Sequence, residues 1–444
     1  MKTSLIELTN ELYQLTLLFP KKEPLRYKLR ETADDILADF ISLTSYSSIY
    51  QQNEIVLQTK NLKTKLEILD SFLEVAKNQN WVNKENILRL KEKYQKLLKP
   101  FLLQDIKISI LIPCFNEEKS IRKCIESCLN QTKKPYEIVV VDDGSTDRTP
   151  EILKSFEDKI TVVRIPKNTG NKSYAQEFGL KFIHGDVFIT TDADTILDKN
   201  FVKRIFLDFK DRKVAAVAGY VRSLKYNWLT TCRELDYIIG QDIHKLAQSY
   251  INALFVIPGC AGAFRTEVFK KYIGFDHDTV TEDLDFTYKL HENQFKIIYD
   301  KKAIAYTQDP QNLKSYINQM KRWYRGGWQN LIKHLKSISK KEVNVFELSL
   351  IYIEGLMFSA LLFLIPLLNI NFFRHYIFFY FAVLFGCAVY GALTRKRLDL
   401  LFCFPFYFLI VFLNAWIFWE EFIKEIIFKN GDLAWFKPER ARII

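Results

Sequence analysis

The spacing of apolar residues changes twice along this chain and divides it into three parts. Residues 1–103 carry apolar positions at helical spacing, such as Leu5, Leu8, Leu12 and Leu15, and contain no glycine. Apolar positions three and four residues apart lie on one face of a helix. We therefore predict an N-terminal helical region, which either binds a partner or a second copy of the chain, or is only a packing extension.

From Lys107 onward, short apolar runs alternate with amphipathic stretches. The runs 108–113, 137–141, 161–165 and 187–190 are typical of buried strands, and the segments between them have helical spacing. This alternation predicts an α/β domain over residues 104–345, Rossmann-like, with a mostly parallel sheet and helices on both faces. Ligands bind such sheets at the carboxyl ends of the strands. The loops that follow these strands are therefore the candidate site.

The last part of the chain, residues 346–420, contains three long apolar runs at 346–370, 372–393 and 398–419. As helices rising ~1.5 Å per residue, each is long enough to cross ~30 Å of hydrocarbon. We predict three transmembrane helices followed by a basic tail, residues 421–444. Glu354 is one of few ionisable residues in these runs, and it is costly there unless it faces a polar path or a partner.

The distribution of charge suggests how these helices are oriented. The first residues lack a signal-peptide pattern. Basic clusters lie before the first apolar run and between the second and third, and the positive-inside rule places both in the cytoplasm. We expect a multi-pass protein of the cell (plasma) membrane with a cytoplasmic catalytic domain. The basic tail would then lie outside, so either one run is re-entrant or interfacial, or the tail is an exception to the rule.

Composition argues against two other classes of protein. The net charge is +11, but the basic residues are dispersed among 52 acidic ones without a nucleic-acid-binding motif, so no nucleic-acid partner is expected. The seven cysteines are scattered and have no zinc-site spacing, which favours reduced thiols. Any metal ion would be bound by carboxylates, and oxygen ligands suit Mg²⁺ or Mn²⁺.

Acidic motifs follow two of the predicted strands, at Asp142-Asp143 and at Asp192-Ala193-Asp194. Taken alone, the first is equally well a turn with a helix cap, and the second is a common surface-loop pattern. Their position at strand ends favours a shared crevice. Two carboxylates one residue apart can approach a cation that bridges two phosphates, and such a cation neutralises charge on a departing diphosphate.

Two further motifs complete the candidate site. Thr281-Glu282-Asp283 precedes a helical pattern, so it is a capped helix start, but an ionised carboxylate there can also act as a general base. Gln319, Arg322 and Trp323 are spaced to lie on one helix face. A tryptophan near a membrane is more often an interfacial anchor than a sugar platform, and the adjacent arginine favours the sugar site.

As a set, these motifs resemble those of the family 2 glycosyltransferases with the GT-A fold. The resemblance is to the membrane-embedded processive type, which includes cellulose, chitin, hyaluronan and poly-N-acetylglucosamine synthases. It covers about Ile108 to Leu335, and the apolar runs extend it. Many relatives of this type carry membrane spans before the catalytic domain, whereas this chain begins with soluble-looking residues. A partner subunit, a homo-oligomer or a non-processive role therefore stays open.

The resemblance implies a role for each motif. The first nucleotide loop would be Pro113, Phe115 and Glu117, with Phe115 beneath the base. Asp143 would contact uracil, Lys172 phosphate, Asp192 the donor ribose or sugar, and Asp194 the metal. Asp283 would be the base beside Glu282, while Gln319, Arg322 and Trp323 would hold the diphosphate and the acceptor. The segment from Gly259 to Arg265 would lie beneath the acceptor.

The function predicted from these residues is an inverting, metal-dependent transfer of a sugar from a UDP-sugar to an acceptor hydroxyl. By resemblance the sugar is N-acetylglucosamine and the product a β-linked polysaccharide made at the membrane. One alternative is transfer of a single sugar to a polyprenyl phosphate or another lipid- or protein-linked acceptor. Another is an inactive membrane scaffold of the same fold, which would be expected to lose carboxylates that are all present here.

Overall fold

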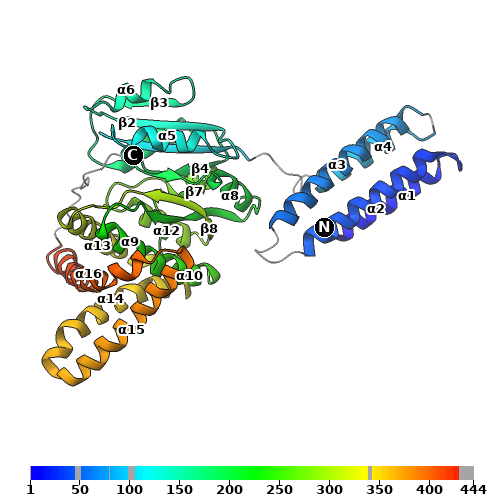
Figure 1. Cartoon of the computed structure of the whole chain (residues 1–444). Helices are drawn as coiled ribbons and strands as arrows, with labels where there is room; N and C mark the ends of the chain where they lie inside the picture. Colours follow the sequence, from blue (N-terminus) through cyan, green and yellow to red (C-terminus); the bar gives the residue numbers. More distant parts are fainter. Residues whose placement is uncertain (1, 46–51, 80, 99–105, 339–342, 430–444) are drawn as a thin grey trace. The chain divides into compact units, whose positions relative to one another are not determined.

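The computed structural model of the chain describes residues 2–45, 52–79, 81–98, 106–338 and 343–429 (Figure 1). It consists of two compact units, residues 1–105 and 106–444. Part of the basic tail, from residue 430 on, and two of the lysines expected on the cytoplasmic side, Lys340 and Lys341, lie outside the described residues.

The first unit contains four helices, as its apolar spacing predicts. They are α1 (Lys2–Leu17), α2 (Pro24–Ser45), α3 (Gln52–Lys77) and α4 (Lys84–Leu98). Leu5, Leu12, Leu69 and Tyr94 are fully buried in the core that these helices share. The unit thus has its own hydrophobic core.

The second unit is built on an eight-stranded sheet with the strand order β3-β2-β1-β4-β7-β6-β8-β5. Its strands are β1 (Ile108–Cys114), β2 (Glu137–Asp143), β3 (Thr161–Ile165), β4 (Val187–Thr190), β5 (Ile196–Leu197), β6 (Val214–Ser223), β7 (Gly262–Arg265) and β8 (Lys296–Thr307). Strands β1 to β4 pair in parallel, as do β6 and β8. Strand β7 runs antiparallel to both β4 and β6. The predicted mostly parallel sheet is confirmed, and the first four strands are those predicted from the apolar runs.

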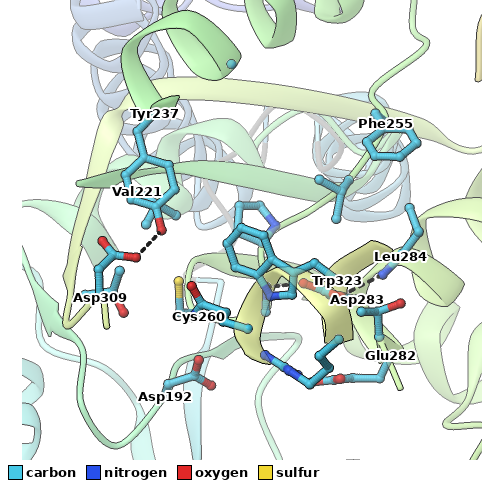
Figure 2. A pocket seen from close by; sticks show the side chains of 18 of the residues that line it. Asp192, Val221, Tyr237, Phe255, Cys260, Glu282, Asp283, Leu284, Asp309 and Trp323 are labelled. Carbon is cyan, nitrogen blue, oxygen red and sulfur yellow. Dashed lines mark hydrogen bonds between the residues drawn. The ribbon is translucent and has the colours of Figure 1, made fainter. Parts of the chain in front are cut away.

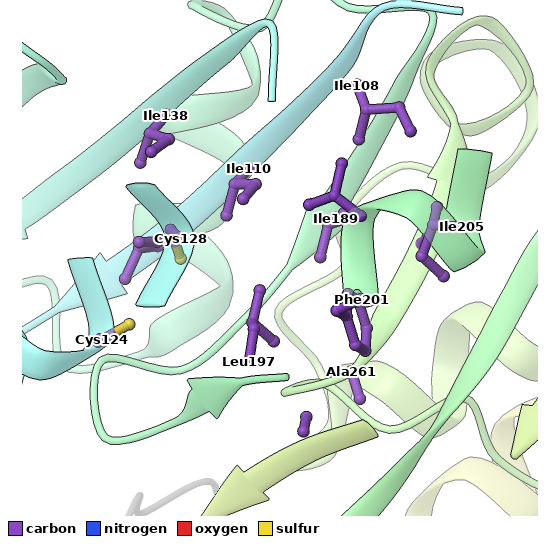
Figure 3. Packing of buried hydrophobic residues seen from close by; sticks show 14 of the residues in the cluster. Ile108, Ile110, Cys124, Cys128, Ile138, Ile189, Leu197, Phe201, Ile205 and Ala261 are labelled. Atoms are coloured by element: carbon purple, nitrogen blue, oxygen red, sulfur yellow. The ribbon is translucent and has the colours of Figure 1, made fainter. Parts of the chain in front are cut away.

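Helices cover both faces of this sheet. They are α5 (Ile121–Leu129), α6 (Thr149–Lys154), α7 (Lys172–Leu180), α8 (Phe201–Asp208), α9 (Trp228–Tyr237), α10 (Leu246–Tyr250), α11 (Thr266–Val268) and α12 (Glu282–Glu292). Figure 3 shows one core, where Ile110 and Ile138 of the strands pack near Cys124 and Cys128 of α5. Since these side chains are fully or almost fully buried, the strands and the loops that follow them are held firmly.

Two π-helical segments interrupt the helices between β6 and α12. The π-helix η2 (Ile238–Lys245) continues α9, and η3 (Phe269–Ile273) continues α11. Such segments are rare and occur frequently at functional sites. The residues of η2 reach the cavity described below.

Four helices follow the sheet: α13 (Leu313–Ile338), α14 (Val343–Leu368), α15 (Ile370–Arg395) and α16 (Asp399–Phe422), which continues into η4 (Ile423–Ile427). Two helical segments, Ile370–Arg395 and Asp399–Ile427, are long and apolar enough to cross a membrane. The third apolar segment, Tyr352–Leu368, is shorter. The described residues therefore give two candidate spans, by length and composition, where the sequence predicts three.

Salt bridges and hydrogen bonds connect α13 to α16. Lys321 lies 2.7 Å from Glu420, and Arg325 lies 3.1 Å from the fully buried Glu421. Tyr316 donates a hydrogen bond of 2.8 Å to Asn414. These contacts fix α13, which carries the Gln-x-x-Arg-Trp motif, against one of the two candidate spans.

Candidate active site

One cavity of about 1190 Å³ contains every site residue predicted from the sequence. Its walls come from the carboxyl ends of β1, β2 and β4, the start of α12 and one face of α13, and it extends to residues of α14 and α15. Figure 2 shows part of this cavity, with Asp192, Glu282, Asp283 and Trp323 around it. The structure thus brings together residues far apart in the chain, whose individual roles remain predictions.

Asp143 fixes the loop that follows β3. Its carboxylate accepts hydrogen bonds from the Thr169 backbone at 3.0 Å, the Thr169 hydroxyl at 2.8 Å and the Asn168 amide at 3.2 Å. Burial raises the pKa of Asp143, and the hydrogen bonds from Thr169 oppose that rise. This carboxylate therefore orders the donor-side loop, whatever contact it makes with a nucleotide base.

The loop after β1, predicted to bind the nucleotide, is held by polar contacts with the turn after β2. Asn116 has φ of 53°, and its side-chain oxygen accepts a hydrogen bond of 2.8 Å from the Thr146 backbone. Glu117 is 7% exposed, and its carboxylate accepts a hydrogen bond of 2.6 Å from the Ser120 hydroxyl. Pro113 and Phe115, beside these residues, also line the cavity.

Lys172 lies between the two acidic motifs. Its ammonium is 2.5 Å from Asp192 and 3.1 Å from Glu282. Burial would lower the pKa of Lys172, but the carboxylates of Asp192 and Glu282 raise it well above the ordinary value. The side chain is therefore a permanent positive charge within the cavity, beside the aspartate motif.

Asp283 is a half-buried carboxylate at the amino end of α12. It accepts hydrogen bonds from the backbone of Gly259 at 3.2 Å and of Leu284 at 3.0 Å. Burial and the neighbouring Glu282 raise the pKa of Asp283 to about 6, while Lys172 and Arg322 oppose the rise. A carboxylate with a pKa near 6 is ionised at neutral pH and basic enough to accept a proton.

At Gly259 the chain passes close to two charged side chains. A Cβ at that position would lie 3.2 Å from the Lys172 ammonium and 3.6 Å from the Asp283 carboxylate. Gly259 and Cys260 line the cavity close to Asp283, and the segment that they begin continues into β7.

The start of α12 also packs directly on α13. Asn330 donates hydrogen bonds of 3.0 and 3.2 Å to the hydroxyl and carbonyl of Thr281, and Gly326 leaves room for that threonine. This contact sets the distance between Asp283 and the face of α13 that carries Gln319, Arg322 and Trp323. The sequence pattern places the three residues on one face, and the structure directs that face into the cavity.

The aspartate pair fits a divalent cation that is shared with a substrate. Asp194 is 2% exposed, Asp192 is nearby, and both line the cavity. No group of three potential metal ligands occurs among the described residues. Mg²⁺ usually binds through one or two carboxylates together with substrate phosphates rather than in an all-protein cage. The residues present suit that mode of binding.

Sequence reasoning missed several polar residues of the cavity, among them Tyr237, Gln241, Lys245 and Asp309. Lys245 is 7% exposed, and burial lowers its pKa to about 8 while Cys260 and Asp283 oppose the change. Gln241 and Lys245 are four residues apart, but Asp242 and His244 lie between them, so no apolar pattern in the sequence marks the pair as facing a cavity. Only the structure shows that they lie on a π-helix.

The sequence of this chain matches a known protein family and several known glycosyltransferases. Residues 109–273 match the model of Glycosyl transferase family 2. The chain is 27% identical over 365 residues to the probable glycosyltransferase YdaM of Bacillus subtilis, an alignment that covers 75% of this chain and 87% of that protein. It is 29% identical over 244 residues to the poly-beta-1,6-N-acetyl-D-glucosamine synthase of Staphylococcus epidermidis, covering 54% of this chain and 59% of the synthase.

Among solved structures, the mannosyltransferase PcManGT from Pyrobaculum calidifontis, in complex with GDP-Man and Mn²⁺, aligns with a TM-score of 0.52. The alignment covers 82% of this chain and 99% of PcManGT at 18% identity, so it supports the fold alone. The chain spans only about three-fifths of the length of the synthase. From the family match and the relatives, the chain is a glycosyltransferase with a family 2 domain of the GT-A fold.

Proposed function

We propose that this protein transfers N-acetylglucosamine from UDP-N-acetylglucosamine to a sugar hydroxyl, with inversion, and so extends a β-linked polysaccharide at the cytoplasmic face of the plasma membrane. The observation that carries the proposal is Asp283, a half-buried carboxylate with a raised pKa in the cavity that also holds Lys172 and Trp323. The names of relatives, a poly-beta-1,6-N-acetyl-D-glucosamine synthase and an N-acetylglucosaminyltransferase, support the choice of sugar.

In this reaction Asp283 accepts the proton of the acceptor hydroxyl. The hydroxyl oxygen forms a bond to the anomeric carbon while that carbon's bond to the diphosphate oxygen breaks, and UDP leaves. Lys172 and Arg322 contribute positive charge next to the departing diphosphate, where charge stabilisation has its greatest effect. A divalent cation held by Asp194, with Asp192 beside it, would neutralise part of the same charge.

The extent of the cavity supports polymer synthesis. Beyond Trp323 its lining includes Glu354, Phe358 and Tyr380, from α14 and α15. Carboxylate and aromatic side chains suit the hydroxyls and apolar faces of a sugar chain. A product formed at Asp283 would therefore have a path towards the membrane helices.

A second candidate, transfer of one sugar to a polyprenyl phosphate, is favoured by the apolar side chains of the same wall. Met357 and Leu361 line the cavity and are exposed, at 60% and 37%. A lipid chain could lie along them.

The two candidates differ in their product. Purified protein in membrane vesicles is given Mg²⁺ and, in separate reactions, one radiolabelled UDP-sugar each. The proposal predicts a large product from UDP-N-acetylglucosamine that a polysaccharide-specific hydrolase degrades. A single sugar on a solvent-extractable lipid would support the second candidate instead, and no transfer from any UDP-sugar would contradict both.

A further inference from the structure

A cluster of buried and half-buried polar side chains beside Trp323 is not used in the reaction described above. It consists of Arg233 and Tyr237 of α9, Asp236 between them, and Asp309, which follows β8. In Figure 2, Tyr237 and Asp309 are seen to one side of the Trp323 indole and Asp283 to the other.

Arg233 supports the indole from outside the cavity lining. Its guanidinium lies 4.9 Å from the centre of the Trp323 ring, within the range of a cation–π contact. Arg233 is 3% exposed and is held 2.7 Å from Asp236 and 3.5 Å from Asp309. Trp323 is 36% exposed and lines the cavity. The indole is therefore fixed on one side and presents free ring surface to a ligand.

Asp309 has one oxygen that is satisfied and one that is not. The first accepts a hydrogen bond of 2.9 Å from the Tyr237 hydroxyl. The second is buried and has no hydrogen-bond partner among the residues that the structure describes, although Asp309 lines the cavity and is only 4% exposed. A buried carboxylate oxygen without a partner is costly, and most such atoms in native proteins are satisfied by a protein group, water or ligand.

We propose that Asp309 is a binding residue for the acceptor sugar: its unpaired oxygen accepts a hydrogen bond from a hydroxyl of the ring that stacks on Trp323, and Tyr237 positions the carboxylate. This inference rests on the proposed function. It specifies a neutral, hydroxyl-rich acceptor, since the cluster sets the two carboxylates of Asp236 and Asp309 against one guanidinium. That excess of negative charge disfavours a phosphate at the same place.

The test uses a soluble β-linked N-acetylglucosamine oligosaccharide as acceptor and the full chain in detergent. Asp309→Asn keeps the size of the side chain and removes its charge. We expect the acceptor KM to rise about 10- to 100-fold, the range for losing a hydrogen bond to a charged group. The matched control is Asp300→Asn, which removes another buried Asp–Arg pair, 2.8 Å from Arg204, outside the cavity and leaves the acceptor KM unchanged.

Affinity for UDP shows whether each variant is folded. If Asp309→Asn fails to bind UDP, the variant Tyr237→Phe is tested instead, because it removes only the hydroxyl that donates to Asp309. Tyr237→Phe is expected to raise the acceptor KM several-fold with little change in kcat. An unchanged acceptor KM in the folded variant would overturn the subsite. If the wild-type protein transfers sugar to a lipid phosphate but not to the oligosaccharide, the proposed function fails, and the subsite fails with it.

Discussion

At the scale of single residues, the chemistry depends on Asp283. Its burial and the adjacent Glu282 raise its pKa to about 6. We predict that Asp283→Asn lowers the rate of transfer by ~10² to 10⁴-fold, the usual contribution of a positioned base. Affinity for UDP should be nearly unchanged, since the amide keeps the shape of the side chain. Single-turnover transfer and UDP titration measure the two quantities, and wild-type turnover in the variant would exclude Asp283 as the base.

The same residue predicts a pH dependence. Asp283 acts as a base only when it is ionised, and its raised pKa means that ionisation requires a higher pH than for an ordinary aspartate. The value of kcat/KM should therefore rise as pH rises through about 6. A pH profile in which the acid limb is the same for wild type and Asp283→Asn would assign that limb to another group.

The two donor-side aspartates should fail in different ways. Asp194→Ala is expected to abolish activity together with its dependence on Mg²⁺ or Mn²⁺, because no cluster of other ligands surrounds it among the described residues. Asp143→Ala should weaken nucleotide binding, since it also releases Thr169 and Asn168. Titrations of UDP and of metal distinguish the two variants, and identical curves would refute this division of roles.

Trp323 should serve the acceptor more than the donor. We predict that Trp323→Ala reduces transfer to an acceptor more than it reduces hydrolysis of the UDP-sugar, because in the proposed reaction ring stacking would hold the acceptor while Lys172 and Arg322 would hold the diphosphate. Comparing transfer with hydrolysis tests this. Loss of folded protein in detergent, with no selective loss of transfer, would instead identify Trp323 as a membrane-surface anchor.

At the scale of elements, the geometry of the site depends on how α13 packs against the start of α12. A Cβ at Gly326 would overlap the Thr281 side chain. We therefore predict that Gly326→Ala shifts α13 and lowers transfer about tenfold or more, since a misplacement of ~1 Å can reduce a rate by ~10²-fold. Gly386→Ala in α15 is the matched control, because no atom lies within 4 Å of its added Cβ. Equal activity of the two variants would show that this contact is not needed.

The elements also show what could be predicted from the sequence. In the structure β1 extends to Cys114 and β2 to Asp143, beyond the predicted runs, so Asp142 and Asp143 end β2. The runs 108–113, 137–141 and 187–190 themselves follow from period and composition alone, because buried parallel strands are continuous apolar runs. The antiparallel position of β7 and the π-helix η2 could not be predicted in this way, because both depend on contacts between segments far apart in the chain. For the same reason Asp309 and Tyr237, on different elements, were not predicted as a pair.

At the scale of the whole molecule, the sheet domain and the candidate membrane helices share one cavity. Glu354 of α14 lines the cavity together with Tyr380 of α15. We predict that Glu354→Leu in reconstituted vesicles shortens or blocks the polysaccharide while UDP binding persists, because a carboxylate in an apolar helix is costly unless it serves a polar path such as the sugar chain would follow. Product sizing measures the effect. A full-length polymer made by this variant would show that Glu354 does not contribute to the path of the sugar chain.

The most direct test of the central claim is UDP release coupled to product formation. Wild-type protein in membranes, supplied with UDP-N-acetylglucosamine and Mg²⁺, should release UDP and build a hydrolase-sensitive β-linked polysaccharide, while Asp283→Asn binds UDP but does neither at a comparable rate. UDP release with no sugar incorporated, or equal incorporation by wild type and Asp283→Asn, would contradict the account.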